Sequence, residues 1–228
     1  MNATSLLRRW TVATAVGLSI GMGTAFAAFL ARPSEQLTYA IWGLPGIWVA
    51  IGQMIALPLA RSHPARWLLA GAAASSIGIP GGIGLGLVAI MAIPARAIGP
   101  DGPIPTPAFQ VLIVLIPYAL AGLLAGLVLG AIQAPVFPAI DHKRTKWVLY
   151  SSAAWLVAGA LMGALFLVAG SSSILSPAAR MEWLVWLLLT ILFGAIAGVV
   201  AGIITCSGVS LMDLANASNA GIASQDAA

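Results

Sequence analysis

Six long apolar stretches constrain this chain more strongly than any other feature of its sequence, because none of them has a charged residue in its middle. A helix of about 20 apolar residues spans the hydrocarbon core of a bilayer. Strands are not expected, since the stretches show no alternation of period two and open strand edges cannot lie in lipid. The sequence therefore predicts an all-α bundle of six transmembrane helices, over residues 10–31, 38–60, 67–93, 110–133, 147–169 and 183–205.

Composition excludes the water-soluble classes of protein. Of the 228 residues, 61% are hydrophobic and only 7% are charged, whereas soluble domains carry about 25% charged residues. The ten Lys and Arg residues flank the apolar stretches, which is typical of topology-setting charges and not of a nucleic-acid surface. We expect residues 1–212 to form one membrane domain in the lipid bilayer, and residues 213–228 to form a polar, disordered tail.

The distribution of basic residues predicts the orientation of the helices. Seven of the ten lie on one side of the expected bundle and three lie on the other side. The positive-inside rule places the richer side in the cytoplasm, and with six crossings both termini are then cytoplasmic. An alternative for the first stretch is a cleavable signal peptide, because Arg8 and Arg9 precede it and Ala25-Phe26-Ala27 is similar to a cleavage site.

An internal repeat relates the stretches to one another. With a shift of 80 residues Gln53 falls on Gln133 and Trp67 falls on Trp147, and with a shift of 72 residues Gln133 falls on Thr205. We interpret these matches as three copies of a two-helix unit in the same orientation, arranged about an axis along the membrane normal. That symmetry differs from the inverted repeats of many transporters.

Glycine recurs every four residues in the fourth and sixth stretches. This spacing places three glycines on one face of each helix, and such faces let helices approach closely in lipid. We predict that both faces pack against other helices. The glycines are Gly122, Gly126 and Gly130 in the fourth stretch, and Gly194, Gly198 and Gly202 in the sixth.

Two further patterns within the stretches predict local geometry. Pro80, Gly81 and Gly82 interrupt the third stretch, and they predict either a broken helix, as at many transporter binding sites, or a packing kink. Three tryptophans each follow a basic residue at the start of a stretch, so we expect them to be anchors at the membrane surface. They are Trp10, Trp67 and Trp147.

Gln53, Gln133 and Thr205 form the candidate polar site, since they occupy matching repeat positions near the cytoplasmic ends of their helices. Two interpretations remain open: a hydrogen-bonded clamp between helices, or a ring of polar groups that holds a solute on the axis. No catalytic, cofactor-binding or metal-binding residues are expected, because the stretches contain no histidine or carboxylate. His63 and His142 lie in loops.

The segment Gly130-Ala131-Ile132-Gln133 leads into the basic His142-Lys143-Arg144 and then into Trp147. On these residues, and on Gly202-Ile203-Ile204-Thr205, the chain resembles a group of bacterial multi-pass membrane proteins over about half of its length. In that group a glycine-spaced helix leads into a Gly-x-x-Gln segment. Ala134 stands where the group has a tryptophan. The resemblance implies a location in the bacterial inner membrane and no particular activity.

Three functions are compatible with the sequence, and none is enzymatic; the third of them is a lipid- or pigment-associated protein that serves as an accessory subunit. The first is a structural or accessory membrane subunit that packs against itself or a membrane partner through its glycine faces. The second is a carrier or substrate-binding component for a small uncharged solute near Gln53 and Gln133. A polar central cavity would favour the second function, and a close-packed centre would exclude it.

Overall fold

The computed structural model describes residues 3–31, 34–57, 60, 63–91, 107–136, 143–171 and 182–208. Within these ranges all regular elements are helical, which confirms the predicted all-α class. The expected tail at residues 213–228 lies outside the described residues. The helices are α1 (Ala3–Leu30), α2 (Glu35–Ala56), α4 (Pro64–Met91), α5 (Pro107–Gln133), α6 (Lys143–Ser171) and α7 (Glu182–Gly208), with a short 3₁₀ turn η2 (Ala134–Val136).

Five of these helices are long and apolar enough to cross a membrane, which indicates a multi-pass membrane protein. In α2 the apolar part, Ala40–Ala56, is shorter, so a sixth crossing stays a prediction. The five segments are Ser5–Leu30, Pro64–Gly86, Val114–Gln133, Arg144–Leu165 and Leu184–Thr205.

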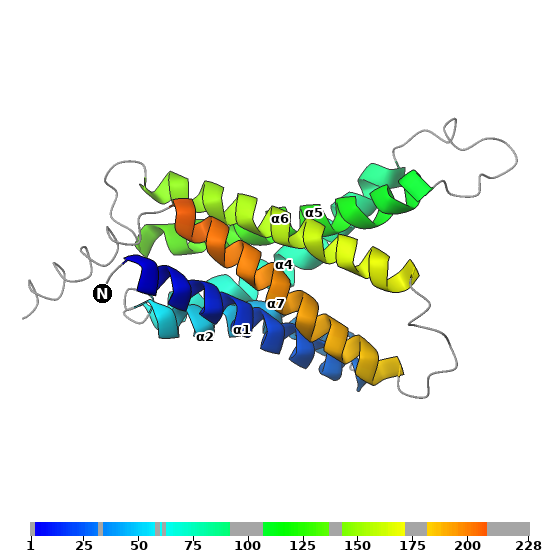
Figure 1. Cartoon of the computed structure of the whole chain (residues 1–228), viewed down its shortest axis with the longest axis horizontal. Helices are drawn as coiled ribbons and strands as arrows, with labels where there is room; N and C mark the ends of the chain where they lie inside the picture. The colour runs from blue at the N-terminus through cyan, green and yellow to red at the C-terminus, as the bar shows by residue number, and fades with distance from the viewer. Residues whose placement is uncertain are drawn as a thin grey trace, which may run out of the picture.

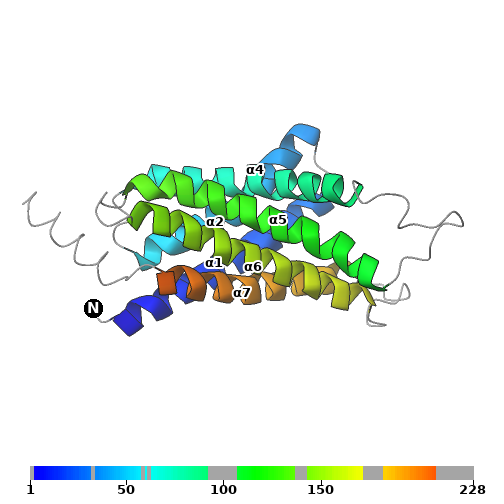
Figure 2. The same ribbon diagram turned by 90° about the horizontal axis from the view of Figure 1, so that it is seen from above.

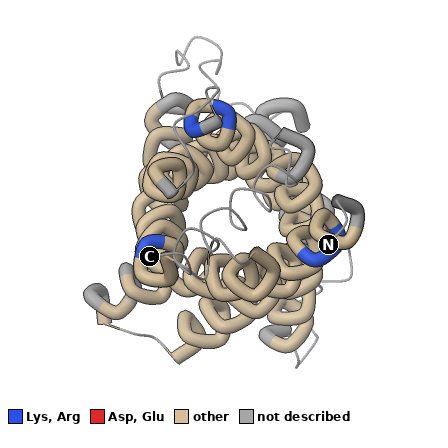
Figure 3. The backbone as a smooth tube through the Cα atoms, turned by 90° about the vertical axis from the view of Figure 1, so that its left-hand side faces the viewer, with Lys and Arg blue, Asp and Glu red and all other residues tan. Residues whose placement is uncertain are grey.

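The helices form a closed ring in chain order. Each helix packs against the next one along the chain, and α7 returns to pack against α1. The start of α1 and the end of α7 lie at the same end of the bundle (Figures 1 and 2). Seen from that end, the helices surround a common axis (Figure 3). This arrangement gives every helix one face toward the axis and one face toward lipid.

Glycines bring neighbouring helices of the ring into backbone contact. A Cβ atom on Gly126 of α5 would lie 2.5 Å from the Ser151 carbonyl oxygen of α6, and one on Gly198 of α7 would lie 2.5 Å from the Ala15 Cα of α1. Gly122 and Gly130 likewise meet α6, and Gly194 and Gly202 meet α1. Both glycine faces are therefore covered by helices of this chain, where close approach replaces the missing hydrophobic drive.

The helix break predicted at Pro80, Gly81 and Gly82 is not present, since α4 is helical from Pro64 to Met91. Gly82 instead packs on the Ala121 backbone of α5. This close approach explains the glycine without a break. A proline within a buried helix is tolerated where neighbouring helices and small local adjustments satisfy the backbone.

The proline in α2 is supported by a hydroxyl from α4. Pro45 has no N–H to donate. At the next residue, the Gly46 N–H donates to Ser75 Oγ at 3.1 Å. The Ser75 hydroxyl lies 3.1 Å from the Gly43 carbonyl across the interface and 3.0 Å from the Gly71 carbonyl on its own helix. Ser75 thus joins α2 to α4 by hydrogen bonds that lipid could not supply.

Candidate functional site

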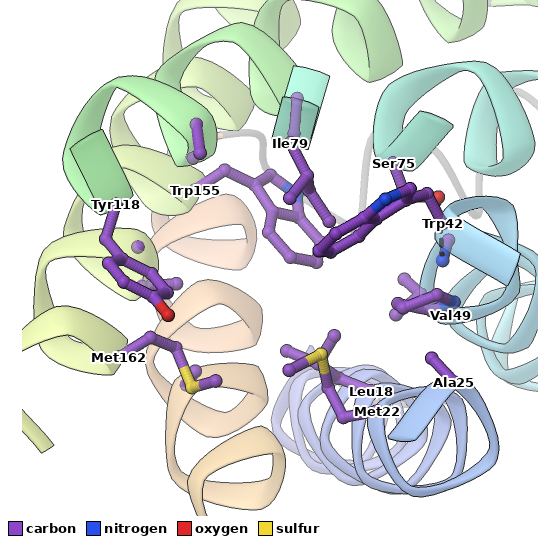
Figure 4. Close-up of a pocket in the computed structure, with 18 of the residues that line it drawn as sticks. Leu18, Met22, Ala25, Trp42, Val49, Ser75, Ile79, Tyr118, Trp155 and Met162 are labelled. Atoms are coloured by element: carbon purple, nitrogen blue, oxygen red, sulfur yellow. Dashed lines mark hydrogen bonds between the residues drawn. The ribbon is translucent and has the colours of Figure 1, made fainter. Parts of the chain in front are cut away.

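A cavity of about 260 Å³ lies inside the ring, and residues of all six helices line it (Figure 4). It occupies the part of the bundle away from the start of α1, because its lining on α1 begins only at Leu18 and extends to Phe29. One lining residue from each helix in chain order is Met22, Trp42, Ile79, Tyr118, Met162 and Thr190.

The lining is apolar and rich in aromatic rings. Figure 4 shows Trp42, Trp155 and Tyr118 from three different helices around one space, with the thioether of Met162 beside Tyr118 and that of Met22 opposite the two indoles. None of the described lining residues carries a charge. A cavity of this chemistry favours uncharged molecules with aromatic or aliphatic groups, because an ion would lose its hydration without gaining a partner.

The two hydroxyls of Ser and Thr in the lining are already used by the protein. Ser75 makes the α2–α4 bonds described above, and Thr190 Oγ1 donates to the Trp186 carbonyl oxygen at 2.7 Å. These groups add little polarity to the cavity surface. The lining therefore differs from the polar central site that the sequence predicts for a solute carrier.

Three tryptophans close one end of the ring. The ring centroids of Trp10, Trp67 and Trp147 lie 5.9 to 6.3 Å apart in edge-to-face contacts. Their exposed fractions are only 1%, 0% and 2%. The expectation that they anchor the membrane surface is therefore wrong. Neighbouring residues on a helix point about 100° apart, so each preceding cation faces outward while the indole faces the axis.

Trp10, Trp67 and Trp147, which we call the tryptophan triad, lie on the same side of the cavity along their three helices. On α1, α4 and α6 the tryptophan precedes the first cavity-lining residue by about two helical turns. Leu6, Leu57, Ala60 and Ala134 pack against the triad in one buried cluster. Together they seal the bundle at the end where the exposed cations Arg8, Arg9, Arg66, Arg144 and Lys146 lie, which we name the basic face (Figure 3).

The predicted polar residues lie beside this seal and not in the cavity. Gln133 Nε2 donates to Gln53 Oε1 at 3.4 Å, and Thr205 Oγ1 accepts from Trp10 Nε1 at 3.0 Å. All three polar side chains are buried, and none of them lines the cavity. The structure thus joins the glutamines to each other and Thr205 to the triad, as interhelical clamps do.

Sequence reasoning missed the aromatic lining. Trp155 and Tyr118 fall well inside their apolar stretches, whereas interfacial aromatic residues fall at the ends. The depth of these two residues within their stretches was the sequence signal that could have identified them as residues of an internal site. Comparison with known proteins adds no relative: no family model, no curated protein and no solved structure matches the chain. The resemblance to bacterial multi-pass proteins stays a prediction.

Proposed function

We propose that this chain is a membrane-embedded binding protein that holds a small, uncharged, mainly apolar molecule inside its ring of helices. The observation that carries the proposal is the aromatic and aliphatic cavity lined by all six helices. A ligand there would contact every helix, so its binding would stabilise the whole ring. No cofactor or catalytic step is part of this function.

The cavity volume sets the size of the ligand. An apolar cavity of about 150 Å³ binds benzene, and drug-sized ligands fill about 300–1,000 Å³. The 260 Å³ found here suits a molecule of one or two rings, or a short hydrocarbon segment. The aromatic rings of Trp42 and Trp155 would stack against a planar ligand.

Three matching contacts support the threefold repeat as part of this proposal. A Cβ on Gly46 would meet the Gly71 carbonyl oxygen, and the equivalent pairs at the next two junctions are Gly126 with Ser151 and Gly198 with Thr14. Shifts of 80 and 72 residues relate Gly46 to Gly126 and Gly126 to Gly198, and the same two shifts define the sequence repeat. In this proposal the cavity lies on a pseudo-threefold axis between three two-helix units.

The proposed location is the inner membrane of a bacterium, with the basic face in the cytoplasm. The exposed cations at this end support that orientation through the positive-inside rule. Both ends of the chain would then be cytoplasmic, as the sequence predicts. The tryptophan triad would close the cavity toward the cytoplasm.

The alternative of a structural subunit has less support. It was motivated by the two glycine faces, and these are covered by α6 and α1 of the same chain. The exposed apolar side chains on the outside of the ring are explained by lipid contact. A homo-oligomer or a membrane partner would have to use a different surface.

A fluorescence titration tests the proposed function. Bromobenzene, an aromatic molecule whose heavy atom quenches indole fluorescence on contact, is added to the protein in nanodiscs and is expected to quench the tryptophans of the cavity at saturation. Ala158→Phe fills the cavity from α6 and should weaken this binding at least tenfold, because Ala158 is buried and lines the cavity. Ala153→Phe, on the exposed side of α6, is the matched control and should bind like the unsubstituted protein. Equal quenching in all three proteins would refute cavity binding.

A further inference from the structure

We propose that the tryptophan triad is the closed gate of a path along the ring axis, through which a small uncharged solute passes between the cavity and the basic face. This inference goes beyond binding, because it makes the chain a carrier. It rests on where the triad lies and on the unpartnered polar atoms that surround it.

The triad lies across the ring axis between the described cavity and the basic face. Its three indoles come from α1, α4 and α6, which alternate around the ring, and their rings meet one another edge to face. Removing or turning one indole therefore opens space at the centre. Apolar constrictions of this kind gate membrane pores by excluding water.

Buried polar atoms without a hydrogen-bond partner surround the gate. They include Trp67 Nε1 within the triad and Gln133 Oε1 of the glutamine pair. Thr14 Oγ1 and Ser151 Oγ follow one helical turn further toward the cavity, and they are unpartnered too. All four side chains are at least 98% buried.

A plug that served only to hold the fold would be apolar or fully hydrogen-bonded, because an unpartnered buried polar group is costly. These atoms gain partners when water or the polar group of a solute enters the opened path. Thr14 and Ser151 occupy equivalent positions of the proposed repeat. The polar layer therefore lies in the buried interior of the bundle and not on its outer surface.

The charges at the opening of the path further restrict the charge of the solute. Arg9, Arg66 and Lys146 directly precede the three tryptophans and are exposed at the basic face. A ring of positive charge repels cations from the opening. Because the apolar cavity beyond it disfavours anions as well, the path suits a neutral solute with at most a small polar group.

Cysteine accessibility tests the gate without knowing the solute. In a Cys206→Ser background, Ser151→Cys places a thiol on the cavity side of the triad. The neutral, water-soluble reagent 2-hydroxyethyl methanethiosulfonate is applied to the protein in nanodiscs, which leave both faces accessible. We expect negligible labelling with the triad intact and labelling at least tenfold faster after Trp67→Ala. Trp48→Ala, which removes a half-buried tryptophan outside the triad, should leave the thiol protected.

Two results would overturn the gate. One is rapid labelling of Ser151→Cys while the triad is intact, and the other is unchanged protection after Trp67→Ala. If Trp67→Ala does not elute as a single species in size-exclusion chromatography, Trp67→Leu replaces it, and its labelling rate is compared in the same way. The readout involves no ligand, so failure of the gate leaves bromobenzene binding untouched, and failure of binding leaves the labelling pattern untouched.

Discussion

Gly46→Ala is expected to lower the free energy of unfolding by about 2–3 kcal/mol, toward the upper end of the range for overpacked sites. The added Cβ would meet the Gly71 carbonyl group and would lie 2.5 Å from Ser75 Oγ. A carbonyl of the facing helix cannot turn aside as a flexible side chain can, so α2 and α4 must move apart. That movement also breaks the hydrogen bond from the Gly46 N–H to Ser75.

Gly84→Ala is the matched control on α4, because nothing lies within 4 Å of a Cβ at that position. Alanine is a better helix former than glycine by up to about 1 kcal/mol, so this variant should be unchanged or slightly more stable. Unfolding by sodium dodecyl sulfate in mixed micelles, followed by circular dichroism, measures both variants. Similar stabilities for Gly46→Ala and Gly84→Ala would mean that α2 and α4 are not in backbone contact.

Trp67→Ala is expected to cost about 3 kcal/mol, at the lower end of the usual range for Trp→Ala in a core. Trp67 is fully buried and contacts both other rings of the triad, at 6.1 and 6.3 Å. Lipid also solvates the side chain in the unfolded state, so moving the indole out of the core costs little transfer free energy. The loss comes mainly from the cavity left behind and from the two ring contacts.

The same unfolding assay separates this effect from the loss of any tryptophan. Trp48→Ala removes a half-buried indole outside the triad and should cost less than half as much. Equal losses would contradict a special role of the triad in packing. The pair Trp10→Ala and Trp67→Ala should also be non-additive, because each removes the contact that they share.

The helical class and the glycine spacing could be read from the sequence because both depend on local pattern. Apolar stretches without internal charge leave helices as the natural spanning element, and a four-residue glycine spacing defines a face before any partner is known. Which helix covers that face depends on the ring. The sequence therefore could not tell that Gly126 meets α6 and Gly198 meets α1.

The errors have a physical cause as well. A tryptophan after a cation at a helix start has the same local pattern whether it lies at the lipid surface or on the axis. The proposed repeat assigns Trp10, Trp67 and Trp147 to equivalent positions, and closing the ring brings the three rings together. Of the two alternatives predicted at Pro80, the break is wrong because α4 continues through this residue with α5 packed closely against the neighbouring glycines, and the packing kink stays a prediction.

Cavities are harder to predict, because they depend on how side chains from separate helices meet. Trp155 and Tyr118 lie on α6 and α5, and their rings share one space only after α1 and α7 close the ring. The polar residues were easier to find in the sequence but lie at the sealed end. The aromatic cavity therefore replaces the two glutamines as the candidate site.

Native mass spectrometry of the chain, extracted gently from its own membrane, tests the central claim most directly. Cavity binding predicts one small molecule of low polarity retained per chain, and its loss from Ala158→Phe but not from Ala153→Phe. A chain that carries no molecule, or the same molecule kept by Ala158→Phe at unchanged stoichiometry, would contradict the claim. A bare chain bound to another polypeptide would instead favour the structural subunit.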